Sequence, residues 1–306
     1  MGMDEIRREI DYYRIKIHET NHPYFWYYLA DAQARAGFTA QALQSIDTAL
    51  SFTSPFPSRQ GLLELRTMLQ PNPPQETPTI VTAKRGDIDG DGVLDNVLLT
   101  AHKTADSPFW QQITLVIQNG RTHQDQQITL PNNGGYNPTL FLGDFTGNKV
   151  DDILVVIDSG GSSGSIYAYV FSQMNGQMRQ IFDSETFNVT YQYEVNYDNQ
   201  YKATVLSKNV KEQYVLDLTY KGKEYLGEIY TPKGELKAPI EGWVNPLSGL
   251  YPIDFNRDGT NELLAYQRIA GRYNADGLGY VETVLKWNGQ RFAHDRQNVA
   301  IVGGQI

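Results

Sequence analysis

The chain has 306 residues, a formal net charge of −9 and no cysteine. This length suits two ordinary domains or one large β domain with an appendage. The missing cysteines exclude disulfides, thiol catalysis and Cys-ligated zinc, and an acidic chain without a basic stripe is not expected to bind nucleic acid.

Residues 1–70 are predicted to be helical. In DEIRREIDYYRIKIH, apolar side chains recur every three to four residues at Ile6, Ile10, Tyr13 and Ile17, the spacing of one helix face. The opening MGMDEIRREI lacks the apolar core of a signal peptide, so none is expected there. No stretch of the chain is long and apolar enough to span a bilayer.

The segment PYFWYYLADAQARAGFTAQALQSIDTALSFTSPFP resembles a tetratricopeptide repeat, a helix–turn–helix unit of 34 residues. The matching positions are Trp26, Leu29, Ala30, Gly37, Ala42, Ile46, Ala49 and Pro55, and Gln33 departs from the aromatic residue usual there. The preceding helix and a closing helix in SRQGLLELRTMLQ would give about one and a half repeats. The aromatic run 24–28 is expected to pack between helices; a peptide-binding surface is the alternative.

PNPPQETP, residues 71–78, is predicted to be a stiff, proline-rich linker and the domain boundary. From residue 79 onward, short apolar runs separated by turn signals such as Asn119-Gly120, Lys221-Gly222 and Asn288-Gly289 predict strands joined as hairpins. The expected fold is therefore α+β and multidomain: helices in 1–70, the linker 71–78, and an all-β domain over 79–306.

Three acidic loops in the predicted β domain carry oxygen side chains at loop positions 1, 3, 5 and 9. Such loops wrap hard cations, with a backbone carbonyl at position 7 and a glycine at position 6. The candidate metal ligands, including the position-7 carbonyls, are Asp87, Asp89, Asp91, Val93 and Asp95; Asp144, Thr146, Asn148, Val150 and Asp152; and Asp254, Asn256, Asp258, Thr260 and Glu262.

These loops are phased: the first two begin 57 residues apart (87 to 144) and the last two 110 apart (144 to 254), close to two such periods. An EF-hand would continue into a helix with Glu at position 12, where this chain has Leu98, Val155 and Ala265. Strands are predicted on both sides of each loop instead. The pattern over residues 76–306 resembles the FG-GAP/VCBS type of calcium-loop repeat of integrin-like β-propellers.

That resemblance implies blade-sized units of about four strands, about four units in all. The expected fourth unit lies near residue 199, where YEVNYDNQYKATVL lacks a complete ligand set. A closed four-bladed ring and an open β array both remain alternatives.

Calcium is the expected cation, because the ligands are hard oxygens without His or Cys. Two or three ions are expected, in the occupancy order first, third, second, because Lys149 replaces the turn glycine in the second loop. Magnesium in place of calcium stays open. The competing interpretation is that the loops are only polar turns.

No catalytic constellation is recognisable. DSGGSSGS at 158–165 is expected to be a plain loop, since it matches neither a nucleophile elbow nor a P-loop. Loops carrying Trp243, Tyr251, Arg268, Arg272 and Tyr273 could form a ligand rim or pack on one another.

The expected function is a non-enzymatic, calcium-binding interaction or scaffold protein. Its cations would be structural, and a protein partner would bind through the propeller loops or the helical groove. A carbohydrate-binding or polysaccharide-degrading protein and a structural cell-envelope or spore-layer protein are the alternatives. The resemblance favours an extracellular or envelope location, because calcium is abundant there.

Overall fold

A computed structural model describes residues 3–52, 59–69, 78–103, 107–161, 163–301 and 303. The chain divides into two compact units, Met1–Glu76 and Thr77–Ile306. Most of the predicted linker 71–78 lies outside the described residues, as does Pro55. The first unit is helical and the second is mostly β, so the coarse α+β prediction is confirmed.

Helices of the first unit are α1 (Met3–Thr20), α2 (Pro23–Arg35), α3 (Thr39–Ser51) and α4 (Arg59–Leu69). The predicted apolar stripe of α1 is confirmed: Ile6 and Ile10 are buried against α2, with Tyr13 and Ile17 packed beside them. No helix among the described residues has both the length and the apolar character needed to cross a membrane.

Small residues let α2 and α3 approach closely. Ala30, Ala42 and Ala49 are fully buried, and Gly37 takes a positive φ of 76° at the turn between the helices. Gln33 is also buried, and its Oε1 accepts a hydrogen bond of 2.7 Å from Ser45 Oγ. A polar pair therefore occupies the position where an aromatic residue was expected.

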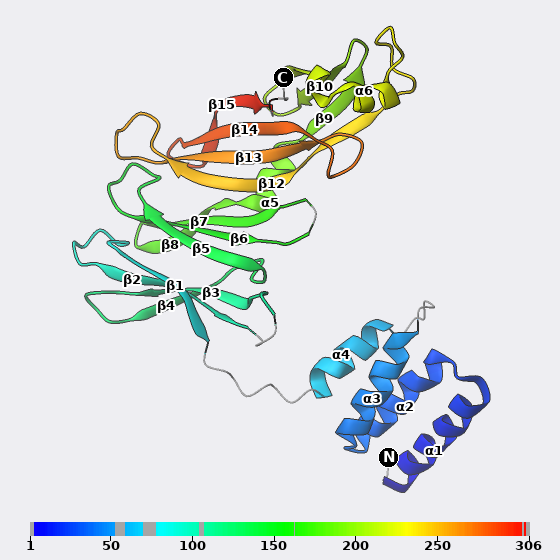
Figure 1. Cartoon of the computed structure of the whole chain (residues 1–306). Helices are drawn as coiled ribbons and strands as arrows, with labels where there is room; N and C mark the ends of the chain where they lie inside the picture. Colours follow the sequence, from blue (N-terminus) through cyan, green and yellow to red (C-terminus); the bar gives the residue numbers. More distant parts are fainter. Residues whose placement is uncertain are drawn as a thin grey trace. The chain divides into compact units, whose positions relative to one another are not determined.

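The described residues of the β-rich unit form three antiparallel sheets (Figure 1). The first sheet is β1 (Thr79–Gly86), β2 (Asp95–His102), β3 (Gln111–Gln118) and β4 (Asp125–Thr129), and the second is β5 (Tyr136–Gly143), β6 (Asp152–Asp158), β7 (Ile166–Met174) and β8 (Gln177–Asp183). The third is ordered β11-β10-β9-β12-β13-β14-β15, with β9 (Tyr193–Asp198), β10 (Lys202–Ser207), β11 (Glu212–Asp217), β12 (Glu241–Ile253), β13 (Glu262–Ala270), β14 (Gly277–Trp287) and β15 (Phe292–Ala300). Two short helices, α5 (Ser184–Thr190) and α6 (Lys223–Ile229), and a 3-10 turn at Thr219–Lys221 connect the strands.

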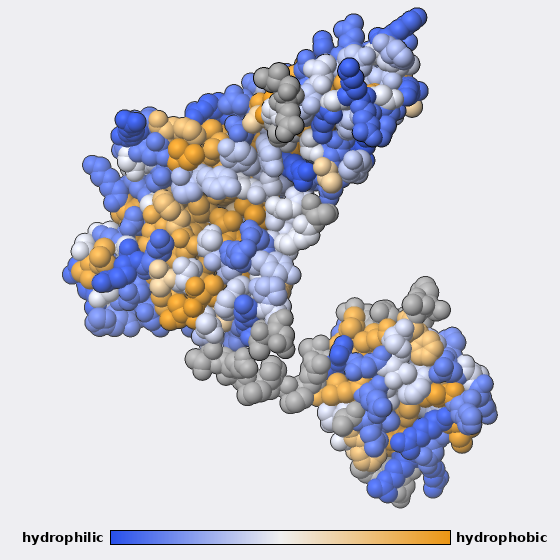
Figure 2. All heavy atoms as spheres, in the orientation of Figure 1, coloured by the Kyte–Doolittle hydropathy of each residue, from blue (hydrophilic) through white to orange (hydrophobic). Residues whose placement is uncertain are grey.

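The second sheet packs between the other two. Alternate residues of β6 serve two cores: Ile153 and Val155 face the first sheet, and Leu154 faces the third. A strand buried on both faces reads as a continuous apolar run, which is why 153–157 is ILVVI. On the face shown in Figure 2, hydrophobic residues gather over β5 and its neighbours, and hydrophilic residues dominate near β10 and α6.

The segment expected to form a fourth unit does not make a separate sheet. Strands β9, β10 and β11 pair with one another and join the third sheet where Glu241 and Gly242 of β12 pair with Asn196 and Val195. The spacing of the acidic loops could not predict that these strands join the third sheet. The joining depends on β12, which has 13 residues and pairs with both β13 and β9.

The predicted hairpin at Lys221-Gly222 is wrong, because α6 follows Gly222. A buried carboxylate organises this region: Asp276 accepts hydrogen bonds from Lys221 Nζ (2.8 Å) and Tyr225 Oη (2.7 Å). Burial alone would raise the pKa of Asp276, but its bonds with Lys221, Tyr225 and the Arg272 N–H lower it. These contacts come from residues some fifty positions away, so local turn signals could not predict them.

Candidate metal centre

The three acidic loops occupy the same place in their sheets. Each joins the first and second strands of a four-strand meander: residues 87–94 join β1 to β2, 144–151 join β5 to β6, and 254–261 join β12 to β13. The prediction that strands flank every loop is confirmed.

The carboxylate at loop position 1 holds the turn together in every copy. Asp87 accepts hydrogen bonds from three backbone N–H groups, including Gly92 N at 2.9 Å. Asp144 accepts one from Lys149 N at 2.7 Å, and Asp254 accepts one from Gly259 N at 2.9 Å. These are the local side chain–backbone bonds that Asp makes in turns.

Two further bonds recur in all three loops. The position-5 side chain accepts from the N–H of position 7, joining Asp91 to Val93, Asn148 to Val150 and Asp258 to Thr260 at 2.8–2.9 Å. The position-9 carboxylate accepts from the N–H of position 2, as Asp95 does from Ile88, Asp152 from Phe145 and Glu262 from Phe255. All three position-9 residues are buried, so each ties the loop to its sheet.

Position 6 requires a left-handed backbone in every loop. Gly92 and Gly259 have φ values of 81° and 89°, and Lys149 has 65°. An L-residue with a side chain is strained by roughly 1 kcal/mol in this region. Position 4 is also left-handed, at Gly90, Gly147 and Arg257, a feature of the repeat that the sequence reading missed.

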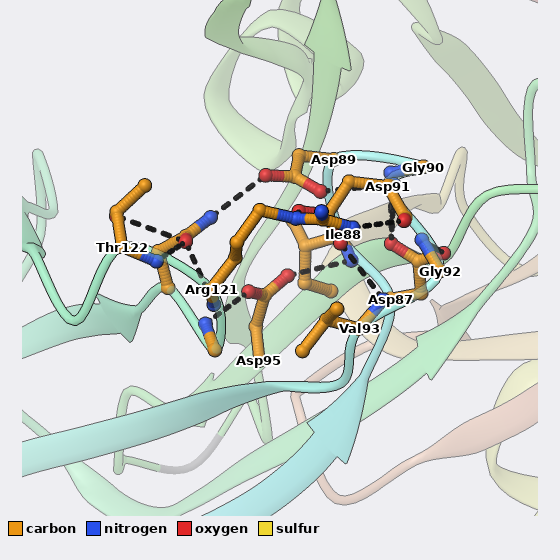
Figure 3. A network of polar contacts seen from close by, with 12 residues as sticks. Asp87, Ile88, Asp89, Gly90, Asp91, Gly92, Val93, Asp95, Arg121 and Thr122 are labelled. Carbon is orange, nitrogen blue, oxygen red and sulfur yellow. Dashed lines mark hydrogen bonds and ion pairs between the residues drawn. The ribbon is translucent and has the colours of Figure 1, made fainter.

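The first loop concentrates the most negative charge. Carboxylate oxygens of Asp87, Asp89 and Asp95 lie within 4.8 Å of one another. Arg121 lies across the loop (Figure 3), with Nε 2.5 Å from Asp91 Oδ2 and Nη2 2.7 Å from Asp91 O. This guanidinium holds the pKa of Asp91 below its usual range. Arg121 therefore offsets part of the charge and leaves the other three carboxylates without an ion pair among the described residues.

The second loop contains buried oxygens with unmet bonding capacity. Thr146 Oγ1 and Asp152 Oδ1 are buried and have no hydrogen-bond partner within the part of the chain that the structure describes. Burial raises the pKa of Asp152, and the N–H groups of Phe145 and Thr146, which donate to its other oxygen, only partly oppose this effect. These oxygens belong to positions 3 and 9, two of the predicted ligand positions.

The third loop is partly compensated by a lysine. Lys286 Nζ lies 3.4 Å from Glu262 Oε1. Asp258 accepts hydrogen bonds from the Thr260 N–H and from Asn256 Nδ2, and these bonds lower its pKa. The candidate ligand oxygens of the third loop are therefore more occupied by contacts with protein groups than the unpartnered oxygens of the second loop.

Neighbouring loops are bonded directly to each other. The N–H of Asp151, at position 8 of the second loop, donates to Asp87 O at 3.0 Å, and Asn261 of the third loop donates to Asp144 O at 2.7 Å. A methyl group on Gly86 would lie 2.4 Å from Asp151 Oδ2, so the missing side chain at Gly86 leaves room for the Asp151 carboxylate.

The residue before each loop and the residue at loop position 8 also explain where the row of bonded loops ends. The residue before the third loop is Ile253 rather than glycine, because no further loop approaches it among the described residues. Position 8 of the first loop is Leu94, which is 48% exposed. Asp151 is a site residue that the sequence analysis missed. Gly86 and Gly143, each directly before a loop, are the sequence signal that could have indicated where the next loop packs.

Only some of the proposed rim residues meet. Tyr251 and Arg268 line a cavity of about 430 Å³ together with Tyr266 and Tyr280. Trp243 instead donates to Asn245 Oδ1, and Arg272 pairs with Glu228 at 2.8 Å. Tyr273 contacts the Arg272 guanidinium, 5.8 Å from the ring centroid.

A larger cavity of about 840 Å³ lies beside α5, β8 and the start of β15. Its aromatic residues pack on one another: the rings of Phe187 and Tyr191 stack at 4.5 Å, and Phe182 lies 6.0 Å from Phe187. These rings belong to the core between the second and third sheets, so their main role is structural.

The architecture defines a class of two-unit proteins in which a helical segment precedes stacked sheets with repeated acidic loops. Comparison with known proteins then identifies the family. Residues 191–300 match the YybI C-terminal domain. The uncharacterized protein YybI of Bacillus subtilis (strain 168) is 62% identical over 233 residues, which cover 76% of this chain and 89% of that protein. The chain belongs to the YybI family.

Proposed function

We propose that this protein is a non-enzymatic, calcium-binding interaction protein whose cations are structural in the β-rich unit. The loops offer hard oxygens, which suit calcium. Partners would bind to the loop-bearing β unit or to the helical groove.

The observation that carries the proposal is the grouping of Asp87, Asp89 and Asp95 within 4.8 Å. Like charges at such separations repel, and a divalent cation would turn that repulsion into attraction. The unpartnered Thr146 Oγ1 and Asp152 Oδ1 support a second site, because buried polar atoms without partners cost free energy that a bound cation would recover.

A structural role is supported by the position of the loops. Each joins the first two strands of a four-strand meander, and hydrogen bonds from Asp151 and Asn261 link successive loops. A cation in any loop would therefore stabilise both its own sheet and the contact with the next.

We further propose that the three sheets are blades of the FG-GAP/VCBS type, arranged as an open propeller-like array. The recurring hydrogen-bond scheme of the loops and the stacking of sheets through two shared cores support this interpretation. The fusion of β9–β11 to the third sheet favours the open array over a closed ring of four.

Calorimetric titration of the full chain with calcium tests the proposal. We expect two to three bound ions in the wild-type protein. The double variant Asp87→Asn, Asp89→Asn should lose one of them, because amides replace two carboxylates of the cluster. The matched control is Asp125→Asn, Asp295→Asn, which changes two carboxylates outside the loops and should leave the stoichiometry intact. Equal stoichiometry in both double variants would contradict binding at the first loop.

A further inference from the structure

The cavity on the third sheet is lined by three tyrosines and one arginine. It measures about 430 Å³ and is lined by Tyr251, Tyr266, Tyr280, Arg268, Ser248 and the Ser163-Gly164 edge of the β6–β7 loop. The tyrosines come from the adjacent strands β12, β13 and β14. Exposed aromatic residues grouped in a hollow with a few polar groups are typical of binding sites.

Tyr251 lies back over its own strand. A methyl group on Gly249 would lie 2.9 Å from the Tyr251 ring. The ring therefore occupies the space that a side chain at position 249 would need. Gly249 is buried, yet Tyr251 itself is 53% exposed. The ring therefore lies against the sheet at Gly249 while about half of the residue stays exposed to solvent.

The neighbouring rings hold Tyr251 in place. Tyr266 meets it edge to face, with centroids 5.5 Å apart, and Tyr280 meets Tyr266 in the same way at 6.1 Å. Edge-to-face contacts are favourable and fix ring orientation. A rigid platform binds with little loss of side-chain entropy.

Arg268 gives the cavity its charge. It is the sole charged side chain among the described residues that line the cavity, and it makes no salt bridge in the part of the chain that the structure describes. Its Nη2 makes only a 3.4 Å contact with Ala275 O. In a protein of net charge −9, an unpaired guanidinium beside an aromatic platform favours a planar anion such as a carboxylate.

We propose that this cavity binds an acidic saccharide, with a sugar ring stacked on the exposed face of Tyr251 and a uronate carboxylate paired with Arg268. The C–H groups of a pyranose face match the solvent-facing side of the ring, and the carboxylate provides the charge that Arg268 lacks. Ser248 and the backbone of the β6–β7 loop supply polar groups for sugar hydroxyls. The inference deepens the proposed binding function, on which it rests, by naming the class of partner.

Calorimetry and saturation-transfer NMR with the full, calcium-loaded chain test this assignment. The probes are trigalacturonate, its methyl ester and a hyaluronan tetrasaccharide. Wild-type protein should bind at least one of the two acidic probes. Esterification of trigalacturonate should weaken its binding about tenfold or more, because it removes a charge-assisted bond.

Variants of two lining residues test whether the ligand binds in this cavity. Tyr251→Ala and Arg268→Gln should each weaken binding about tenfold, while Tyr251→Phe should retain it because the ring face remains. The matched controls Tyr273→Ala and Arg179→Gln change an equally exposed tyrosine and an exposed arginine outside the cavity, and should bind normally.

Three results would overturn the inference: no binding of either acidic probe, equal binding of acid and ester, or equal binding by Tyr251→Ala. Binding of a polyproline peptide instead would reassign the aromatic cavity to peptide recognition. The calcium stoichiometry of every variant should stay at the wild-type value, which shows that its loops are intact. Binding of the acidic probe by wild-type protein that binds no calcium would overturn the proposed calcium function and leave the cavity assignment standing.

Discussion

At the scale of single residues, Lys149 is an unfavourable residue at position 6 of the second loop, where the other two loops have glycine. It holds a left-handed backbone at φ 65°, and its charge lies in a loop expected to hold a cation. Lys149→Gly should raise stability by up to about 1 kcal/mol and strengthen calcium binding by the second loop. Urea denaturation with and without calcium measures both effects.

Lys211→Gly is the matched control. Lys211 has nearly the same φ, 63°, in the β10–β11 turn, outside the acidic loops. Lys211→Gly should relieve the same left-handed backbone strain and so raise stability, but it should not change how much calcium stabilises the protein. If Lys211→Gly and Lys149→Gly shifted the calcium response equally, the second loop would not be a cation site.

The buried Asp152 predicts a pH dependence. Burial raises the pKa of Asp152 in the folded protein. In metal-free protein, Asp152 therefore leaves the free energy of unfolding unchanged below its unfolded pKa, near 3.9. It destabilises the fold as the pH rises through its higher folded pKa. Calcium binds the ionised form, so the stabilisation by calcium should grow over the same pH window. Chemical denaturation from pH 4 to 7 with and without calcium measures this, and Asp152→Asn should flatten the difference.

At the scale of elements, the contact between neighbouring loops depends on missing side chains. Gly86→Ala would place a methyl group 2.4 Å from Asp151 Oδ2, so we expect a loss of about 1–3 kcal/mol from overpacking. Gly227→Ala is the control, because nothing lies within 4 Å of that position in α6. Denaturant midpoints compare the two, and equal stability of both variants would contradict the close approach of the loops.

Sequence reasoning worked where the signals are local. The apolar stripe of α1, the strands beside each acidic loop and the hairpins at Asn119-Gly120 and Asn288-Gly289 follow from spacing and turn chemistry within a few residues. It failed at α6, whose position depends on Asp276 in the distant β13–β14 loop, and at β9–β11, which joined another sheet. The role of Asp151 was also hidden, because it appears only when the first and second sheets pack.

At the scale of the whole molecule, the β-rich unit is a stack in which each sheet depends on its neighbour. The second sheet contributes to two cores, and hydrogen bonds between neighbouring acidic loops link the three sheets. Loss of cations from any loop is therefore expected to weaken the contacts on both sides.

The most direct test is thermal unfolding of the full chain in excess calcium and in excess chelator, with matched magnesium and ionic strength. Calcium at about a hundred times its dissociation constant should add roughly 2.7 kcal/mol per site and raise the melting temperature of the β-rich unit by several degrees. An unchanged melting temperature, with no heat of binding, would mean that the three loops are polar turns alone and would contradict the account.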